Sequence, residues 1–319
     1  MARILVTGGV GFIGYHVTRA LLARGDQVLI VDDFSDAPYP RLEKRRNEAD
    51  LRDEFPQTRV VEACVTDRAA IAPLVLECDR VLHLAGLAGV RPSFSDPARY
   101  ARVNVEGTAV VQELARQAGI ERFVFASSSS VYGNSTPLPA REDAPATVPE
   151  SPYAASKRSA ELVAASLCRA APRMRCSALR FFTVYGPRQR PEMAIAHFVR
   201  STLAGAAIPV FGDGSMRRDF THVDDIVRGI LAVLDLEGPA GFRPYNLGSG
   251  APIDLRALVA AIGVAAGRAP HVENAPLQVG DVNATFADIT RAREELGWEP
   301  RVKLADGLAS VVAWVRSRA

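Results

Sequence analysis

Tyr153 and Lys157 stand four residues apart in the segment 151–157, and Ser128 precedes Tyr153 by twenty-five residues. On a helix, residues i and i+4 share a face, so the Lys157 ammonium can lie beside the Tyr153 phenol. A phenol with an ordinary pKa of about 10 becomes a usable base near neutral pH when a neighbouring cation favours the phenolate. The pattern therefore predicts a proton-transfer site, with Tyr153 as base and Ser128 as the hydroxyl that steadies the reacting oxygen. An ordinary pair on a helix surface is the alternative.

Lysine is scarce in this chain. Lys44, Lys157 and Lys303 are the three lysines among 38 basic residues, which leaves thirty-five arginines. Because arginine is the usual cation here, a lysine at position 157 indicates a need for a compact point charge. This favours the catalytic interpretation of Lys157.

The segment 7–14, Thr-Gly-Gly-Val-Gly-Phe-Ile-Gly, lies between an expected strand over 4–7 and an expected helix over 12–24. It satisfies both GxGxxG and GxxGxxG. Glycines in such a turn let backbone N–H groups approach a pyrophosphate, and the helix N-terminus favours the anion. The segment predicts a dinucleotide-binding turn, and a plain glycine turn is the alternative. The expected contact residues are Gly8, Gly11, Phe12, Ile13 and Gly14.

Asp32 follows a second expected strand, over 27–31. A carboxylate at this place accepts hydrogen bonds from the adenosine ribose and repels a 2′-phosphate, so the predicted cofactor is NAD rather than NADP. Arg41, Arg45 and Arg46 could reverse that preference. We interpret them as solvated charges on the next helix.

Further apolar strand patterns occupy 59–64, 80–84, 121–126 and 176–181, with helical patterns between them. Strands that alternate with helices indicate a parallel sheet covered on both faces. The predicted fold class is therefore α/β, a Rossmann doubly wound parallel sheet. After about residue 180 the alternation weakens, and frequent proline and glycine indicate a smaller C-terminal α/β unit.

The composition excludes several classes of protein. A net charge of +2 over 319 residues gives no basis for nucleic acid or membrane as the main partner. The four cysteines form no CxxC pair, so we predict no metal site and a reducing compartment. The chain opens directly on a strand pattern and has no apolar stretch of 18 residues. We expect a cytoplasmic protein without a signal peptide.

Five segments together carry a resemblance to a known family: 7–14, 84–86 (Leu-Ala-Gly), 127–133 (Ser-Ser-Ser-Ser-Val-Tyr-Gly), 153–157 (Tyr-Ala-Ala-Ser-Lys) and 180–187. In this combination the chain resembles the extended short-chain dehydrogenase/reductases over nearly its whole length, and more narrowly the nucleotide-sugar 4-epimerases. The resemblance implies an NAD-binding Rossmann domain over 1–180, rejoined by about 219–249. It implies a nucleotide-sugar-binding domain over 181–218 and 250–319, and a homodimer through a two-helix face that includes 105–117 and 154–165.

The same resemblance assigns roles around the cofactor. Ser128 is implied to bind the sugar 4-oxygen, and Lys157 the ribose of the nicotinamide. Asn104, in an expected helix over 100–119, is implied near the nicotinamide half. At the adenine end Cys64 stands where relatives carry an acid, so the contact is expected from the backbone of Val65 or from Asp67. Leu84, Ala85 and Gly86 are further implied cofactor contacts.

Two serines, Ser129 and Ser130, follow Ser128. Sugar-nucleotide dehydratases of this superfamily carry an Asp-Glu pair there, and UDP-glucuronate decarboxylases carry a Glu. The resemblance therefore implies an enzyme that only oxidises and re-reduces C4 of the sugar.

Arg218, which precedes Asp219 and Phe220, is implied to bind the substrate diphosphate. The other residues implied at the nucleotide side are Val210, Phe211, Gln278 and Asp281. At the sugar, Thr183 and Arg190 resemble the UDP-glucuronate 4-epimerases, whereas glucose 4-epimerases usually carry Asn at the first position. The donors implied for a C6 carboxylate are Thr183, Arg190, Ser127 and Ser129.

The resemblance therefore predicts that the protein is a UDP-glucuronate 4-epimerase, with a UDP-sugar as its substrate. Such an enzyme forms a transient 4-keto sugar with tightly bound NAD. A UDP-glucose/UDP-galactose 4-epimerase is the alternative. A non-catalytic dinucleotide-binding protein is a third, and intact Ser128, Tyr153 and Lys157 argue against it.

Overall fold

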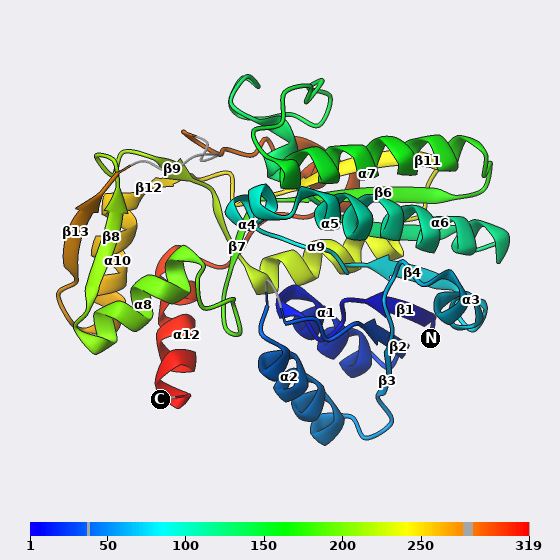
Figure 1. Ribbon diagram of the computed structural model, residues 1–319, viewed down its shortest axis with the longest axis horizontal. Helices are drawn as coiled ribbons and strands as arrows, with labels where there is room; N and C mark the ends of the chain where they lie inside the picture. Colours follow the sequence, from blue (N-terminus) through cyan, green and yellow to red (C-terminus); the bar gives the residue numbers. More distant parts are fainter. Residues whose placement is uncertain (37–38, 277–282, 319) are drawn as a thin grey trace.

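A computed structural model describes residues 1–36, 39–276 and 283–318 of the protein. Its centre is a seven-stranded sheet in which every pair of neighbours is parallel (Figure 1). The spatial order is β11 (Gly241–Leu247), β6 (Arg175–Phe181), β5 (Arg122–Ser128), β4 (Arg80–His83), β1 (Arg3–Thr7), β2 (Gln27–Asp32) and β3 (Arg59–Glu62). The chain runs outward from β1 in one direction and then from β4 in the other. The predicted doubly wound Rossmann sheet is confirmed, and ligands bind at such a reversal of strand order, beyond the carboxyl ends of the strands.

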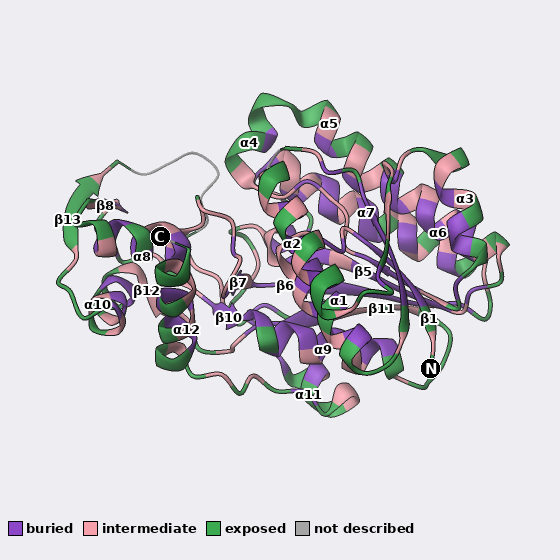
Figure 2. Cartoon of the chain, turned by 90° about the horizontal axis from the view of Figure 1, so that it is seen from below, coloured by how far each residue is buried: buried purple, intermediate pink, exposed green. Residues whose placement is uncertain are grey.

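Alternate residues of the strands pack on opposite faces of the sheet. Ile4 and Val6 join a buried cluster with α1 (Phe12–Ala23) and α9 (Val223–Asp235), to which α2 (Arg41–Glu54) adds Leu51. Leu5 joins a second cluster on the other face with α3 (Arg68–Leu76), α6 (Gly107–Gln117) and α7 (Pro152–Arg169). Figure 2 shows the buried strands between these two layers of helices. Because the strands are buried on both faces, their sequences are nearly continuous runs of apolar residues.

A smaller α/β unit lies beside the large sheet (Figure 1). Its strands β8 (Ala207–Phe211) and β13 (His271–Ala275) pair in parallel. Three helices, α8 (Ala194–Ala204), α10 (Leu255–Ala266) and α12 (Leu304–Ser317), share one apolar core with β8. The predicted smaller C-terminal unit is therefore present.

Short strand pairs connect the two units. β7 (Thr183–Tyr185) pairs with β10 (Phe220–His222), and β9 (Arg217–Arg218) pairs with β12 (Ile253–Asp254). The chain then returns to the large sheet through α9 and β11, and α11 (Thr290–Leu296) packs on both of these elements. The domain boundaries expected from the sequence stay a prediction.

The segment before α6 differs from the single helix expected over 100–119. It consists of α4 (Val90–Ser95), α5 (Pro97–Ala101) and a π-helical turn over Arg102–Glu106. A π-turn inserts a residue and redirects the side chains around it, often at functional sites. Here it carries Asn104.

Candidate active site

A cavity of about 440 Å³ opens beyond the carboxyl ends of β1, β4 and β5. The glycine-rich turn forms one wall. An added Cβ at Gly8, whose φ is +71°, would lie 2.7 Å from Ala85 N, and one at Gly14 would lie 2.0 Å from Gly8 O. Gly11 is the N-cap of α1 and offers no side-chain cap, so the first backbone N–H groups of the helix remain available for an anion. The predicted residues Gly8, Gly11, Phe12, Ile13 and Gly14 all line the cavity, and their arrangement fits a dinucleotide pyrophosphate.

Asp32 also lines the cavity, and the structure pairs it with a lysine that the sequence argument did not place there. Lys44 Nζ donates to Asp32 Oδ1 at 2.9 Å and to Asp33 Oδ1 at 3.3 Å. Both Asp32 and Lys44 are buried. Burial raises the pKa of the Asp32 carboxyl, and the positive charge of Lys44 opposes that rise. The scarcity of lysine, which singled out Lys157, could have identified Lys44 by the same argument.

Three arginines on α2 pair with carboxylates and do not belong to the described residues of the cavity wall. Arg41 contacts Glu62 at 2.6 Å, Arg45 pairs with Glu62 and with Glu48, and Arg46 contacts Glu43 at 2.6 Å. Their charges are partly compensated at the helix surface. This agrees with their interpretation as solvated helix charges.

At the adenine end, Val65 lies in the cavity wall as expected, together with Ala63. Asp67 is different, because its carboxylate caps α3 by accepting from Ala69 N and Ala70 N at 3.1 Å each. Through these bonds Asp67 holds the start of α3. It does not belong to the described residues of the cavity wall, so the structure does not support the idea that Asp67 replaces the acid missing at Cys64.

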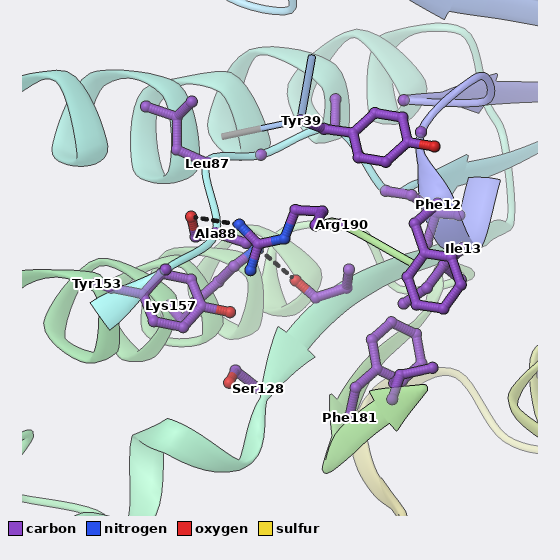
Figure 3. A pocket seen from close by; sticks show the side chains of 18 of the residues that line it. Phe12, Ile13, Tyr39, Leu87, Ala88, Ser128, Tyr153, Lys157, Phe181 and Arg190 are labelled. Carbon is purple, nitrogen blue, oxygen red and sulfur yellow. Dashed lines mark hydrogen bonds between the residues drawn. The ribbon is translucent and has the colours of Figure 1, made fainter. Parts of the chain in front are cut away.

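Tyr153, Lys157 and Ser128 converge on the cavity from two elements (Figure 3). Ser128 is the last residue of β5, and Tyr153 lies in the first turn of α7, which Ser151 caps by accepting from Ala154 N at 3.1 Å. Lys157, one turn along, donates from Nζ to Ala126 O at 2.9 Å. The expected proton-transfer group is thus assembled between a strand end and a helix start.

The groups that shift the pKa of Tyr153 differ from those expected, since Lys157 was predicted to lower it. Burial raises the pKa of the Tyr153 phenol, while the hydrogen bond from Ser128 and the positive charge of Arg190 oppose the rise. Lys157 is not among the groups that act on the Tyr153 pKa, and its ammonium donates to the Ala126 carbonyl. Burial lowers the pKa of Lys157 to about 8, and Glu161 opposes that change. The cation acting on Tyr153 is Arg190, which the sequence had suggested only for the substrate.

Leu84, Ala85 and Gly86 line the cavity as predicted. Asn104 does not belong to the described lining residues, so its predicted direct contact with the cofactor is not supported. Its Oδ1 accepts from Leu87 N at 2.7 Å, and its Nδ2 donates to Leu87 O at 3.0 Å. Asn104 therefore fixes the loop after β4, and the π-turn gives it the reach to do so.

At the substrate end, Ser127, Ser129, Thr183, Arg190 and Arg218 line the cavity. The hydroxyl of Ser127 is already engaged, because it donates to Glu161 Oε1 at 2.6 Å. This makes Ser127 a poor donor to a C6 carboxylate, contrary to expectation. Arg190 donates to Ala88 O at 3.3 Å and lies 3.2 Å from Glu192.

Val210 and Phe211 are absent from the described residues of the cavity wall. Val210 is buried in the core of the smaller unit, which contradicts its predicted substrate contact. The ring of Phe211 lies 5.0 Å from the Arg91 guanidinium. The predicted residues Gln278 and Asp281 lie outside the described part of the chain.

One acidic residue in the cavity wall was missed. Glu150 lines the cavity three residues before Tyr153, and its Oε1 accepts from Asn134 N at 3.1 Å. The family resemblance points only to positions 129 and 130, because relatives carry their acids there. Its place just before the cap of α7 was the available signal.

In the ranges that the structure describes, no group of three or more His, Cys, Asp or Glu side chains could hold a metal ion. Within the same ranges, no helix has the length and apolar character needed to cross a membrane.

Comparison with known proteins agrees with this geometry. The chain is 37% identical to a UDP-glucuronate 4-epimerase of Thermodesulfobacterium geofontis, over 98% of this chain and 96% of that protein. It is 38% identical to a UDP-glucose 4-epimerase of Mycolicibacterium smegmatis, over 99% of both chains. The solved UDP-glucuronic acid 4-epimerase of Bacillus cereus, in complex with UDP-glucuronic acid and NAD, superimposes with a TM-score of 0.92 at 30% identity, covering 99% of this chain and 100% of that one.

The match to a family profile extends over most of the chain. Residues 4–248, from β1 through β11, match the profile of the NAD dependent epimerase/dehydratase family. This range includes the glycine-rich turn, Asp32, Ser128, Tyr153 and Lys157. The chain belongs to the NAD-dependent epimerase/dehydratase family.

Proposed function

We propose that this protein is a UDP-glucuronate 4-epimerase that interconverts UDP-glucuronate and UDP-galacturonate with tightly bound NAD. One observation carries the proposal: a single cavity joins the glycine cradle and Asp32 to Ser128, Tyr153 and Lys157, with Thr183 and Arg190 in the same wall. The full-length similarity to UDP-glucuronate 4-epimerases supports the choice of sugar.

The residues that would hold NAD follow the cavity from end to end. The glycine-rich turn would bind the pyrophosphate, Asp32 the adenosine ribose, Val65 the adenine, and Lys157 the nicotinamide ribose. The backbone of 84–86 would border the cofactor. When bound, NAD supplies an acceptor for the C4 hydride and returns the same hydride.

Proton transfer is the work of the protein side chains. The hydrogen bond from Ser128 and the charge of Arg190 oppose the effect of burial on the Tyr153 pKa and so favour the phenolate. In that form Tyr153 Oη would accept the proton of the sugar 4-hydroxyl while Ser128 Oγ hydrogen-bonds the same oxygen. The sugar is then a ketone at C4. Once the ketone had turned about its diphosphate linkage, its opposite face would be open to the returning hydride, and Tyr153 would give the proton back to the 4-oxygen. The configuration at C4 is inverted, and no net oxidation occurs.

A glucuronate substrate requires a restraint on its carboxylate. Oxidation at C4 makes a β-keto acid, which loses carbon dioxide when the breaking bond aligns with the carbonyl π orbital. Donors from Thr183 and Arg190 would hold the carboxylate near the plane of the ketone and prevent that alignment. Positions 129 and 130 carry no acid, so protonation of an enolate from those positions is also disfavoured.

On the nucleotide side, we propose that Arg218 binds the diphosphate, and that Gln278 and Asp281 bind the uridine. We also propose the domain division 1–180 with 219–249, and 181–218 with 250–319. A homodimer would form through α6 and α7, where Leu162 is 56% exposed. Light scattering after size exclusion tests the dimer, and fractionation of the cells tests the proposed cytoplasmic location.

The experiment that tests the function is proton NMR of the purified protein with UDP-glucuronate and without added NAD. We expect an equilibrium mixture with UDP-galacturonate. Tyr153→Phe is the control and should retain NAD but give no conversion. Faster conversion of UDP-glucose than of UDP-glucuronate would instead favour a UDP-glucose 4-epimerase. The similarity to the mycobacterial UDP-glucose 4-epimerase supports that alternative. Conversion of neither sugar by a protein that retains NAD would indicate a non-catalytic dinucleotide-binding protein.

A further inference from the structure

The loop over residues 186–190 carries Arg190 into the cavity and is held in an unusual conformation. Arg188 has a φ of +66°, a backbone region that residues with large side chains rarely adopt. Gln189 supports the turn, because its N donates to Gly186 O at 3.2 Å and its Nε2 donates to Val184 O at 2.9 Å. Other contacts must hold Arg188 in this conformation.

The Arg188 side chain makes those contacts with the NAD-binding half of the protein. Its guanidinium donates to Asn47 Oδ1 and Asp50 Oδ2 of α2, each at 2.5 Å. The same group lies 3.7 Å from the centre of the Tyr15 ring of α1 and 4.7 Å from that of Trp314 of α12. One planar cation thus joins two helices of the large unit to a helix of the smaller one.

The backbone of Arg188 is bound as well. Tyr39, which lines the cavity, donates from its hydroxyl to Arg188 O at 3.0 Å. Asn47 Nδ2 donates to Tyr39 Oη at 3.2 Å and to Val10 O of the glycine-rich turn at 2.9 Å. A continuous set of direct contacts therefore runs from the glycine-rich turn to Arg188, two residues before Arg190. Figure 3 shows Tyr39 and Arg190 among the side chains that line the cavity.

We propose that Arg188 is a positioning residue that fixes the 186–190 loop to the cofactor-binding elements and thereby holds Arg190 at the sugar. Arg188 does not belong to the described cavity wall, so it acts through the loop rather than on the substrate. The inference rests on the proposed function, since it requires a nucleotide sugar at Arg190. Small displacements of a positioning group are costly because the reacting geometry tolerates little error.

Arg188→Asn is the informative variant. Asparagine accepts a positive φ more readily than most residues, so the backbone is spared while the guanidinium contacts are lost. We expect KM for the preferred nucleotide sugar to rise by about tenfold and kcat/KM to fall by roughly 10- to 100-fold. The amount of retained NAD and a cooperative thermal transition should be unchanged.

Arg318→Ala is the matched control. Arg318 lies 3.3 Å from the same carboxylate oxygen, Asp50 Oδ2, and 4.4 Å from the same Trp314 ring. It shares the partners Asp50 and Trp314 with Arg188 and is remote in sequence from the loop. We expect its KM to equal that of the wild type. A normal KM in Arg188→Asn, or an equal rise in both variants, would overturn the proposal.

Hydrogen exchange of the amides in 186–193 provides a readout that needs no substrate. Exchange there should be faster in Arg188→Asn than in the wild type or in Arg318→Ala. Unchanged exchange would refute the fixing role of Arg188 even if the protein proves to be an epimerase. Faster exchange in a protein that converts neither sugar would leave the fixing of the loop intact and remove the proposed function.

Discussion

Lys44 Nζ lies 2.9 Å from Asp32 Oδ1, so the carboxylate proposed to hold the adenosine ribose is paired with a buried cation of the same chain. Asp32 also accepts from Phe34 N at 3.0 Å. Lys44 therefore opposes the effect of burial and favours the charged form of this carboxylate. In that form both carboxylate oxygens accept hydrogen bonds, which suits the proposed contact with ribose hydroxyls.

Lys44→Met should leave Asp32 buried without its cation and cost about 3 kcal/mol of folding free energy at neutral pH. The pKa of Asp32 is already raised by burial, and the variant raises it further. A raised carboxyl pKa means that the folded state holds its proton more tightly than the unfolded state. The cost is therefore absent at low pH and grows as the pH rises through the folded pKa. Thermal unfolding at pH 5 and pH 8 should show a wider deficit at pH 8, and NAD retention should fall.

Arg46→Met is the control for this comparison, because Arg46 pairs with Glu43 at the surface of the same helix. It should change stability little at either pH. Equal deficits of Lys44→Met at the two pH values would contradict a charged Asp32.

Lys157→Met should yield a protein that is more stable but inactive. Burial lowers the pKa of Lys157 to about 8 from 10.5. The cost of the buried ammonium is fully present below pH 8 and is relieved as the pH rises from 8 toward 10.5. At pH 7 the variant should gain up to about 3 kcal/mol, less what is lost with the bond to Ala126 O. Urea unfolding at pH 7 measures this, and Lys303→Met, at an exposed position, is the control that should gain nothing. A loss of stability in Lys157→Met would show that the bond to Ala126 outweighs burial.

A buried ion pair supports the strand end that carries Ser128. Glu161 contacts Arg180 at 2.8 Å and accepts from Ser127 at 2.6 Å. Glu161→Gln should cost about 3–5 kcal/mol, since it leaves Arg180 buried without a counter-charge. Replacing both residues by Met should recover most of that loss. Burial acts to raise the pKa of Glu161, but the charge of Arg180 and the hydrogen bonds from Arg180, Ser127 and Arg158 together lower it below the ordinary value. Its contribution should therefore be lost as pH falls below the ordinary value of a Glu. Chemical denaturation of the single and double variants at pH 7 decides this, and a double variant no better than the single one would refute it.

Much of the fold and of the site was predictable because both depend on periodicity and on strand ends. Apolar runs bounded by turns located the strands of the large sheet, and parallel strands bring their carboxyl ends to one edge. Gly8, Asp32 and Ser128 all follow or end strands, so their convergence follows from the topology. Tyr153 and Lys157 needed only the helical repeat to share a face.

The partner chosen by each polar side chain was not predictable in the same way. Asn104 turns to Leu87 because a π-turn replaces the expected regular helix. Ser127 donates to Glu161, thirty-four residues away. Asp67 accepts hydrogen bonds from the first turn of α3 as its N-cap. Such choices depend on tertiary packing, which a single sequence does not encode in a local pattern. Lys44 was an exception, since its rarity was visible from the start.

The restraint on the sugar carboxylate can be tested at Thr183, which lies in the cavity wall with Arg190. If the Thr183 hydroxyl helps to hold the carboxylate in the plane of the C4 ketone, Thr183→Ala should free it to rotate and lose carbon dioxide. We expect the fraction of pentose by-product to rise by about tenfold, the effect of losing one hydrogen bond to a charged group. NMR of the products after a fixed number of turnovers measures that fraction. Ser35→Ala is the matched control, because it removes a hydroxyl from the adenosine end of the same cavity, beside Lys44. The same by-product fraction in Thr183→Ala as in the wild type would show that the carboxylate is restrained by other groups.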